Sequence, residues 1–168
     1  MKFFLIGFMG SGKTYRGKQW ARETGLRFYD LDAEIESKQG SSIAAIFEKK
    51  GEDYFRKIET DMLHSFSEKD DCIIACGGGT ACFNHNIEWM AKNGVTVYLE
   101  ASPAYILKKV INEKEQRPLI SKLNEGEILF FIEQKLKERL PFYNRAAIKL
   151  PVEGLAVDFI PDFFHPDK

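Results

Sequence analysis

The feature that most constrains this chain is the segment Gly7-Phe-Met-Gly-Ser-Gly-Lys-Thr14. It matches the pattern G-x-x-x-x-G-K-[ST], a loop that wraps the phosphates of a nucleotide. An apolar run, Lys2–Ile6, comes before it, and a helical pattern, Lys13–Thr24, opens at its end, which is the setting that the motif requires. The segment therefore predicts a nucleotide-binding α/β domain, in preference to an ordinary glycine-rich turn before a helix.

Each residue type in this loop has a physical task. Glycine lets the backbone approach the phosphates closely and adopt conformations that other residues avoid. The loop amides and the start of the following helix face the negative charge, so Gly10, Ser11 and Gly12 are predicted to bind the nucleotide. Lys13 is expected to reach the β- and γ-phosphates, and the hydroxyl of Thr14 is expected to bind Mg²⁺.

Short β-rich runs alternate with longer helical patterns along the chain, which is typical of a parallel sheet with crossover helices. Several runs are almost continuously apolar, as strands covered on both faces are. The predicted strands are Lys2–Ile6, Leu26–Tyr29, Cys72–Cys76, Val95–Leu99 and a weaker Ala147–Leu150. The predicted helices are Lys13–Thr24, Ile43–Lys49, Asp53–Ser67, Asn86–Asn93, Pro103–Ile111 and Glu127–Leu140, the last ended by Pro141.

Length and charge narrow the class of protein further. A chain of 168 residues suits about one domain. Its 24 basic and 25 acidic residues nearly cancel, so no global basic field predicts binding to nucleic acid or to a membrane. The three cysteines, Cys72, Cys76 and Cys82, lack C-x-x-C spacing and are interpreted as reduced thiols in a cytoplasmic protein.

Two aspartates, Asp30 and Asp32, follow the second predicted strand. In an open parallel sheet, ligands lie beyond the carboxyl ends of the strands, here beside the phosphate loop. One carboxylate could hold Mg²⁺ through water, and the other could orient or deprotonate an attacking hydroxyl. The alternative is that one of them only caps a helix over Ala33–Lys38.

Three consecutive glycines, Gly77, Gly78 and Gly79, follow the third predicted strand. Bare backbone at the carboxyl end of a strand lets a ligand approach closely. The alternative is a loose connection, but three glycines are entropically costly and a plain loop does not need them. The triplet therefore favours a binding site.

The arginines are less decisive. Arg56 and Glu59 are three residues apart in a predicted helix, and the sequence alone favours a surface ion pair of small energy. The alternative is that Glu59 holds Arg56 rigid so that it can grip a substrate carboxylate. Arg139 is ambiguous in the same way. The polar segment from Asn112 to Glu125 is either a solvated connection or a mobile lid.

Taken in order, these motifs resemble the shikimate kinase family over roughly residues 3–146. The resemblance implies a three-layer α/β/α P-loop kinase fold with a five-stranded parallel sheet, formed by residues 1–168 as one domain with a lid over about 112–125. The segments that carry it are the phosphate loop, Asp30-Leu-Asp32, Phe55-Arg56-x-x-Glu59, Gly77-Gly78-Gly79, Val97-Tyr98-Leu99-Glu100, Arg117-Pro118-Leu119 and Arg139-x-x-x-Tyr143.

The activity that the resemblance implies is ATP-dependent phosphorylation of the 3-hydroxyl of shikimate, on the route to chorismate, by a cytoplasmic monomer. Asp32 would bind the shikimate hydroxyls and act as the base. Arg117 of the lid would act with Lys13 on the transferring phosphoryl group, and Asp30 would reach Mg²⁺ through water. The implied nucleotide-binding residues are Gly10, Ser11, Gly12, Lys13, Thr14, Tyr15 and Arg117, and the implied shikimate-binding residues are Asp32, Arg56, Gly77, Gly78, Gly79 and Arg139.

The chain departs from the family pattern at Tyr15, where a small hydroxyl residue is usual, at Lys108 and Lys109, where arginine is frequent, and in a short segment after Ala147. No adenine-binding residue is assigned to that segment. The rival interpretations are another small-metabolite kinase, for gluconate or a nucleoside monophosphate, and a non-catalytic ATP-binding module.

Overall fold

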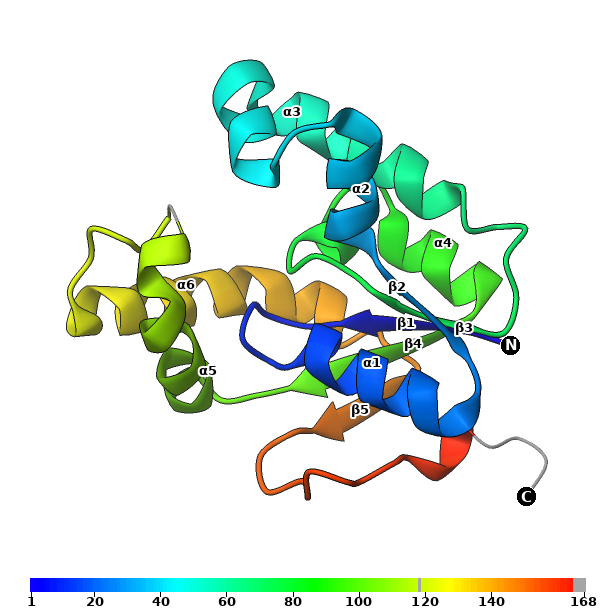
Figure 1. Ribbon diagram of the computed structural model, residues 1–168. Helices are drawn as coiled ribbons and strands as arrows, with labels where there is room; N and C mark the ends of the chain where they lie inside the picture. Colours follow the sequence, from blue (N-terminus) through cyan, green and yellow to red (C-terminus); the bar gives the residue numbers. More distant parts are fainter. Residues whose placement is uncertain (118, 165–168) are drawn as a thin grey trace.

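The computed structural model describes residues 1–117 and 119–164, so Pro118 of the Arg117-Pro118-Leu119 motif lies outside the described residues. Its centre is a sheet of five parallel strands (Figure 1), which confirms the predicted fold class. The strand order is β2-β3-β1-β4-β5. The strands are β1 (Lys2–Ile6), β2 (Arg27–Asp30), β3 (Cys72–Ala75), β4 (Val95–Glu100) and β5 (Ile148–Pro151).

Helices cover both faces of this sheet (Figure 1). On one face, Phe3 of β1 packs edge-on against Phe164 of the C-terminal segment, which also contacts Trp20 of α1 (Lys13–Thr24). On the other face, Phe4 meets Trp89 of α4 (Asn86–Asn93). Consecutive side chains of a strand point to opposite faces of the sheet. Because helices or the C-terminal segment cover both faces, every residue of β1 is buried, and the strand sequence is almost entirely apolar.

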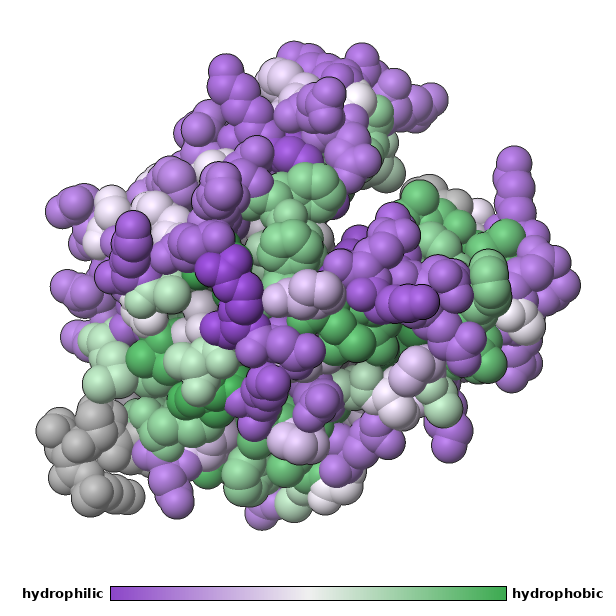
Figure 2. Space-filling model, turned by 180° about the vertical axis from the view of Figure 1, so that it is seen from behind, coloured by the Kyte–Doolittle hydropathy of each residue, from purple (hydrophilic) through white to green (hydrophobic). Residues whose placement is uncertain are grey.

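The remaining helices lie around the carboxyl end of the sheet. α2 (Leu31–Gln39) and α3 (Ile43–His64) form a projecting pair, and α5 (Pro103–Val110) lies against α6 (Glu125–Tyr143). Figure 2 shows the surface hollowed between these two projecting parts. Within the described residues, no helix has the length and apolar character needed to span a membrane.

Gly51 separates the two helical stretches of α3, as the sequence predicts, because its φ of 80° and ψ of 173° are not helical. Two other local expectations need correction. Pro141 does not end α6, which continues to Tyr143; a proline this close to the helix end removes only one of the last hydrogen bonds. The segment from Asn112 to Glu125 is not wholly a loop, since 3₁₀ turns run over Ile111–Gln116.

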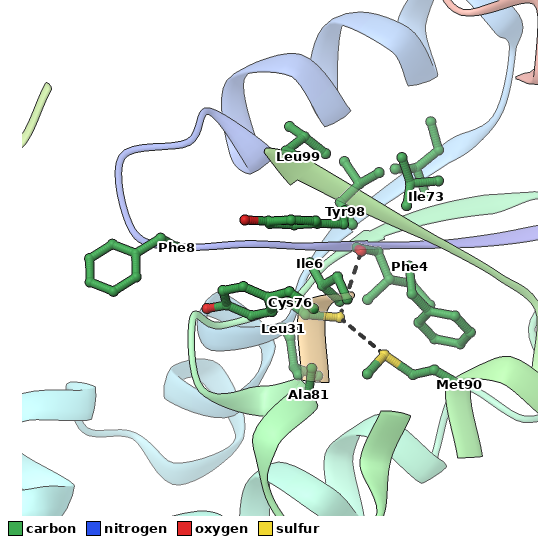
Figure 3. Packing of buried hydrophobic residues seen from close by; sticks show 14 of the residues in the cluster. Phe4, Ile6, Phe8, Leu31, Ile73, Cys76, Ala81, Met90, Tyr98 and Leu99 are labelled. Atoms are coloured by element: carbon green, nitrogen blue, oxygen red, sulfur yellow. Dashed lines mark hydrogen bonds between the residues drawn. The ribbon is translucent and has the colours of Figure 1, made fainter. Parts of the chain in front are cut away.

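The hydrophobic core extends to the edge of the sheet where the phosphate loop begins. Cys76 follows β3, and its Sγ lies 3.9 Å from Met90 Sδ in this core (Figure 3). All three cysteines are free thiols, with Cys72 and Cys76 buried and Cys82 half-buried. Burial raises the pKa of Cys82 to about 11, so this thiol stays protonated at neutral pH.

Candidate active site

The phosphate loop takes a backbone shape that only glycine tolerates at several positions. Gly10 and Gly12 have φ values of 78° and 91°, in the left-handed region. Gly7 is also at positive φ, and a Cβ there would stand 2.8 Å from the carbonyl oxygen of Leu99. The loop therefore presses against the end of β4 at Gly7.

Lys13 is buried beneath this loop. Its ammonium donates hydrogen bonds to the carbonyl oxygens of Gly7, at 2.7 Å, and Phe8, at 2.9 Å. Its pKa is lowered to about 8, mainly by burial and also by Arg139 and Arg117, while the nearby carboxylate of Asp32 acts in the opposite direction. The lysine is thus a desolvated cation held by the carbonyl groups of the phosphate-binding loop.

Thr14 and Asp30 are joined directly. The Thr14 hydroxyl donates to Asp30 Oδ2 at 2.7 Å, and Asp30 Oδ1 accepts from the amide of Ala33 at 3.2 Å. Asp30 therefore caps α2, which confirms the helix-cap interpretation, and it also bonds to the phosphate loop, while its role toward Mg²⁺ stays a prediction. Two oxygen donors side by side fit Mg²⁺, which commonly takes one or two protein ligands and keeps water and phosphate for the rest.

Asp32 lies at the first turn of α2, deep in the site. Its pKa is raised to about 6, mainly by burial and also by the carboxylates of Glu59 and Asp30, while Lys13 acts in the opposite direction. A carboxyl group with a pKa this close to neutrality is suited to accept a proton from a substrate hydroxyl.

The three glycines after β3 are where the site comes together. A Cβ on Gly77 would stand 3.1 Å from Asp32 Oδ1, and a Cβ on Gly78 would stand 2.9 Å from Arg139 Nη1. A Cβ on Gly79 would stand 2.6 Å from Arg56 Nη2. Each glycine thus makes room for one polar side chain, and the triplet brings Asp32, Arg139 and Arg56 together from three different helices.

The ion pair between Arg56 and Glu59 is buried, so the expectation of a surface pair is wrong. Arg56 Nη1 lies 2.9 Å from Glu59 Oε1, and the two side chains are 12% and 1% exposed. The other carboxylate oxygen of Glu59 accepts from the hydroxyl of Thr80 at 2.7 Å. The ring of Phe83 lies 4.1 Å from the Arg56 guanidinium carbon, so the arginine is held on several sides.

The other two predicted arginines also face this region. Arg139 in α6 lies over the ring of Phe8 from the phosphate loop, at 5.2 Å. Arg117 bonds to Glu113 of the preceding 3₁₀ turns and reaches Met9 Sδ at 3.5 Å. Both arginines lower the pKa of Lys13, so their charges act on the same pocket.

Comparison with known proteins agrees with this geometry. Residues 9–156 match the family model described as shikimate kinase. The chain belongs to the shikimate kinase family. It is 43% identical to the shikimate kinase of Phocaeicola vulgatus over 145 residues, which are 86% of this chain and 83% of that protein.

Solved structures of shikimate kinases superpose closely. The crystal structure of the enzyme from Bacteroides thetaiotaomicron gives a TM-score of 0.88 at 37% identity and covers 90% of this chain and 86% of that one. The shikimate kinase of Acinetobacter baumannii in complex with shikimate gives 0.83 at 34% identity, covering 94% and 86%. These relatives support the shikimate kinase interpretation over a gluconate or nucleoside monophosphate kinase and over a non-catalytic module.

Two predicted nucleotide-binding residues differ in their surroundings. Ser11 is buried, and its hydroxyl has no hydrogen-bond partner among the described residues. Tyr15, by contrast, is 61% exposed at the first turn of α1. Ser11 is therefore enclosed within the loop, whereas the ring of Tyr15 faces solvent.

Sequence reasoning missed the residues that support the site from behind. Thr80 donates to Glu59, and the hydroxyl of Tyr143 donates to the carbonyl oxygen of Gly78. On the nucleotide side, buried Arg16 donates to the carbonyl oxygens of Ala156 and Leu155, fixing the C-terminal segment against α1. The only sequence signal was the presence of Tyr143 in the Arg139-x-x-x-Tyr143 motif, since the other contacts join positions that are far apart in the chain.

Proposed function

We propose that this protein transfers the γ-phosphoryl group of ATP to the 3-hydroxyl of shikimate. The observation that carries the proposal is the convergence of Asp32, Arg56 and Arg139 on the three glycines, beside Lys13 of the phosphate loop. A bound acid would meet two guanidinium groups on one side and a carboxylate near its hydroxyls on the other. A nucleotide bound in the phosphate loop would place its γ-phosphate near Lys13, between the nucleotide and the bound acid.

The two arginines bind the carboxylate of shikimate in this proposal. A guanidinium group matches a carboxylate in charge and can bind it through two parallel hydrogen bonds. The backbone of Gly77, Gly78 and Gly79 lets the ring lie close to the sheet. Glu59 holds Arg56 in one orientation, so little side-chain entropy is lost when the substrate binds.

Asp32 orients the shikimate hydroxyl and accepts its proton. Lys13 and Arg117 stabilise the negative charge on the transferring phosphoryl group, because phosphoryl transfer depends mainly on positioning and charge neutralisation. Thr14 would ligate Mg²⁺ and Asp30 would reach it through water, consistent with their adjacent oxygens. The ion, when bound, neutralises part of the phosphate charge.

The nucleotide-binding set comprises the loop residues Gly10, Ser11, Gly12, Lys13, Thr14 and Tyr15 together with Arg117. The segment over about 112–125 acts as a lid that keeps water from competing as the acceptor. We propose further that residues 1–168 form a single domain and that the protein is a cytoplasmic monomer whose partners are small molecules. Its free, largely buried thiols are consistent with that compartment.

The direct test is a coupled assay of ADP release with shikimate, gluconate and AMP as acceptors. We expect turnover with shikimate in the presence of Mg²⁺, and little with the other two. Folded protein that releases no ADP in response to shikimate would contradict the proposal. Faster turnover with gluconate than with shikimate would instead support a gluconate kinase.

Filling the space that Gly79 leaves beside Arg56 should weaken the binding of shikimate. Gly79→Ala places a methyl group 2.6 Å from Arg56 Nη2, so the guanidinium must move, while the backbone at Gly79 (φ −95°) accepts alanine without strain. We expect KM for shikimate to rise about 10- to 100-fold, as for other misplacements of about 1 Å, with KM for ATP unchanged. Gly126→Ala is the control, because its Cβ meets only Asn124 Oδ1 at 3.5 Å. Equal kinetics for both variants would remove Arg56 from the substrate site.

Turnover should depend on the ionisation of Asp32. Its pKa of about 6 means that the carboxylate is available above pH 6 and is lost by protonation below it. We expect kcat/KM for shikimate at saturating ATP and Mg²⁺ to fall tenfold per pH unit below this point. The residual activity of Asp32→Asn should lack that acid limb; an acid limb that persists in the variant would assign it to another group.

A further inference from the structure

Tyr143 lies at the junction of two parts of the site without facing the open pocket. It is the last residue of α6, one helical turn after Arg139, and its side chain is fully buried. Its hydroxyl donates a hydrogen bond to the carbonyl oxygen of Gly78, and the nearby charge of Arg139 acts on the hydroxyl, opposing the effect of burial on its pKa. The hydroxyl therefore lies close both to a substrate-facing guanidinium and to the glycine triplet that the guanidinium contacts.

The surroundings of this tyrosine fix the position of its hydroxyl. The ring stacks on Tyr98 of β4 (labelled in Figure 3), with centroids 5.0 Å apart and planes 29° apart. Burial raises the pKa of the Tyr143 hydroxyl, so it remains a hydrogen-bond donor throughout the working pH range. The ring of Tyr143, packed against the sheet through Tyr98, thus presents one hydrogen-bond donor to Gly78, whatever substrate occupies the site.

The position of the Tyr143 hydroxyl matters because the guanidinium of Arg139 has little room to move. Arg139 Nη1 would be 2.9 Å from a Cβ on Gly78, so the guanidinium lies directly over that glycine. Its other neighbour is the ring of Phe8, which belongs to the phosphate loop. Without a fixed polar group beside it, the long side chain of Arg139 can adopt several rotamers, and ordering it opposes binding.

We propose that Tyr143 is a positioning residue that orients Arg139 over Gly78 and thereby sets the affinity for the substrate carboxylate. This rests on the proposed shikimate kinase activity and adds the group that fixes one half of the carboxylate clamp. Tyr143 does not touch the reacting atoms, and its effect passes entirely through Arg139. The hydroxyl is needed, and the ring alone does not suffice.

The test is the Tyr143→Phe variant, which keeps the ring and its stacking and removes one oxygen. We expect KM for shikimate to rise about tenfold, the size of effect expected when the loss of one polar contact lets a charged group leave its binding orientation. KM for ATP should change less than about twofold. Tyr98→Phe is the matched control, because it removes a hydroxyl from the other ring of the same stack, and it should leave KM for shikimate unchanged.

A double-mutant cycle with Arg139→Leu separates positioning from structural support. If Tyr143 acts through Arg139, adding Tyr143→Phe to Arg139→Leu should raise KM for shikimate no further. Three results would each overturn the proposal. They are additive effects of the two substitutions on KM for shikimate, equal rises in KM for ATP and for shikimate in Tyr143→Phe, and a raised KM for shikimate in Tyr98→Phe. Thermal melts of all variants report whether they fold. Wild-type protein that does not use shikimate would instead refute the proposed function, so the two failures are distinct.

Discussion

Asp32→Asn should remove most of the activity and at the same time make the ligand-free protein more stable. The amide cannot accept the hydroxyl proton, and loss of a positioned general base lowers kcat by about 10²- to 10⁴-fold. ATP binding should persist, because the phosphate loop and Lys13 are unchanged. The expectation of higher stability follows from the pKa of the carboxyl group.

The pKa of Asp32 is about 6 in the folded protein, compared with 3.8 for an unperturbed aspartate. The folded state therefore disfavours the ionised form, and stability falls as pH rises from about 4 to 6 and remains reduced above 6. A shift of about two units corresponds to an upper limit of roughly 3 kcal/mol. A neutral asparagine does not carry this penalty, so its advantage should appear at pH 7 and vanish below pH 4.

The measurements are steady-state kinetics and thermal melting at pH 4 and pH 7. Asp61→Asn is the control, since Asp61 is an exposed acid in α3. Neither the activity nor the melting temperature of the protein should change in this variant. Near-wild-type turnover in Asp32→Asn would remove Asp32 as the base. A lower melting temperature at pH 7 would show that the carboxylate stabilises the fold.

Lys13→Met should be the other severe variant. The ammonium is the buried cation of the phosphate loop, and removing one donor aimed at developing charge lowers kcat by about 10²- to 10³-fold. Its pKa of about 8 shows that the folded protein disfavours the charge when no phosphate is present. Bound phosphates should raise this pKa again, so the lysine holds its charge more firmly once the nucleotide binds.

Kinetics and ATP titrations of Lys13→Met test this expectation. Lys18→Met is the matched control, because Lys18 is exposed on the same helix and its ammonium lies over the ring of Phe28 instead of in the loop. We expect the control to match the wild type in kcat and in ATP affinity. Full turnover in Lys13→Met would mean that another cation, such as Arg117, neutralises the phosphoryl group by itself.

Much of this architecture could be predicted because the signals are local. The apolar run of β1, the glycines of the phosphate loop and the helix that opens at Lys13 are neighbours in sequence and in space. The fold class and the five strands follow from such patterns, with bounds that differ by one residue. The family assignment follows from the order and spacing of several motifs.

Other features depend on contacts between distant residues. Glu59 looks like a surface partner of Arg56 until Thr80 and the glycine triplet are packed over it, which leaves the pair buried. Likewise, Pro141 signals a helix end, yet α6 continues because packing of Tyr143 outweighs one missing hydrogen bond. Sequence periodicity carries no information about which polar groups a neighbouring segment will cover.

The place of β1 in the sheet has a consequence for how the protein is made. This first strand is paired on one side with β3 and on the other with β4, so its partners end at Ala75 and Glu100. During synthesis the chain emerges from its N-terminus, and an apolar strand must wait until about 100 residues exist before both of its edges are covered. The phosphate loop, which follows β1 directly, is therefore expected to take its final shape late, after β4 has been made.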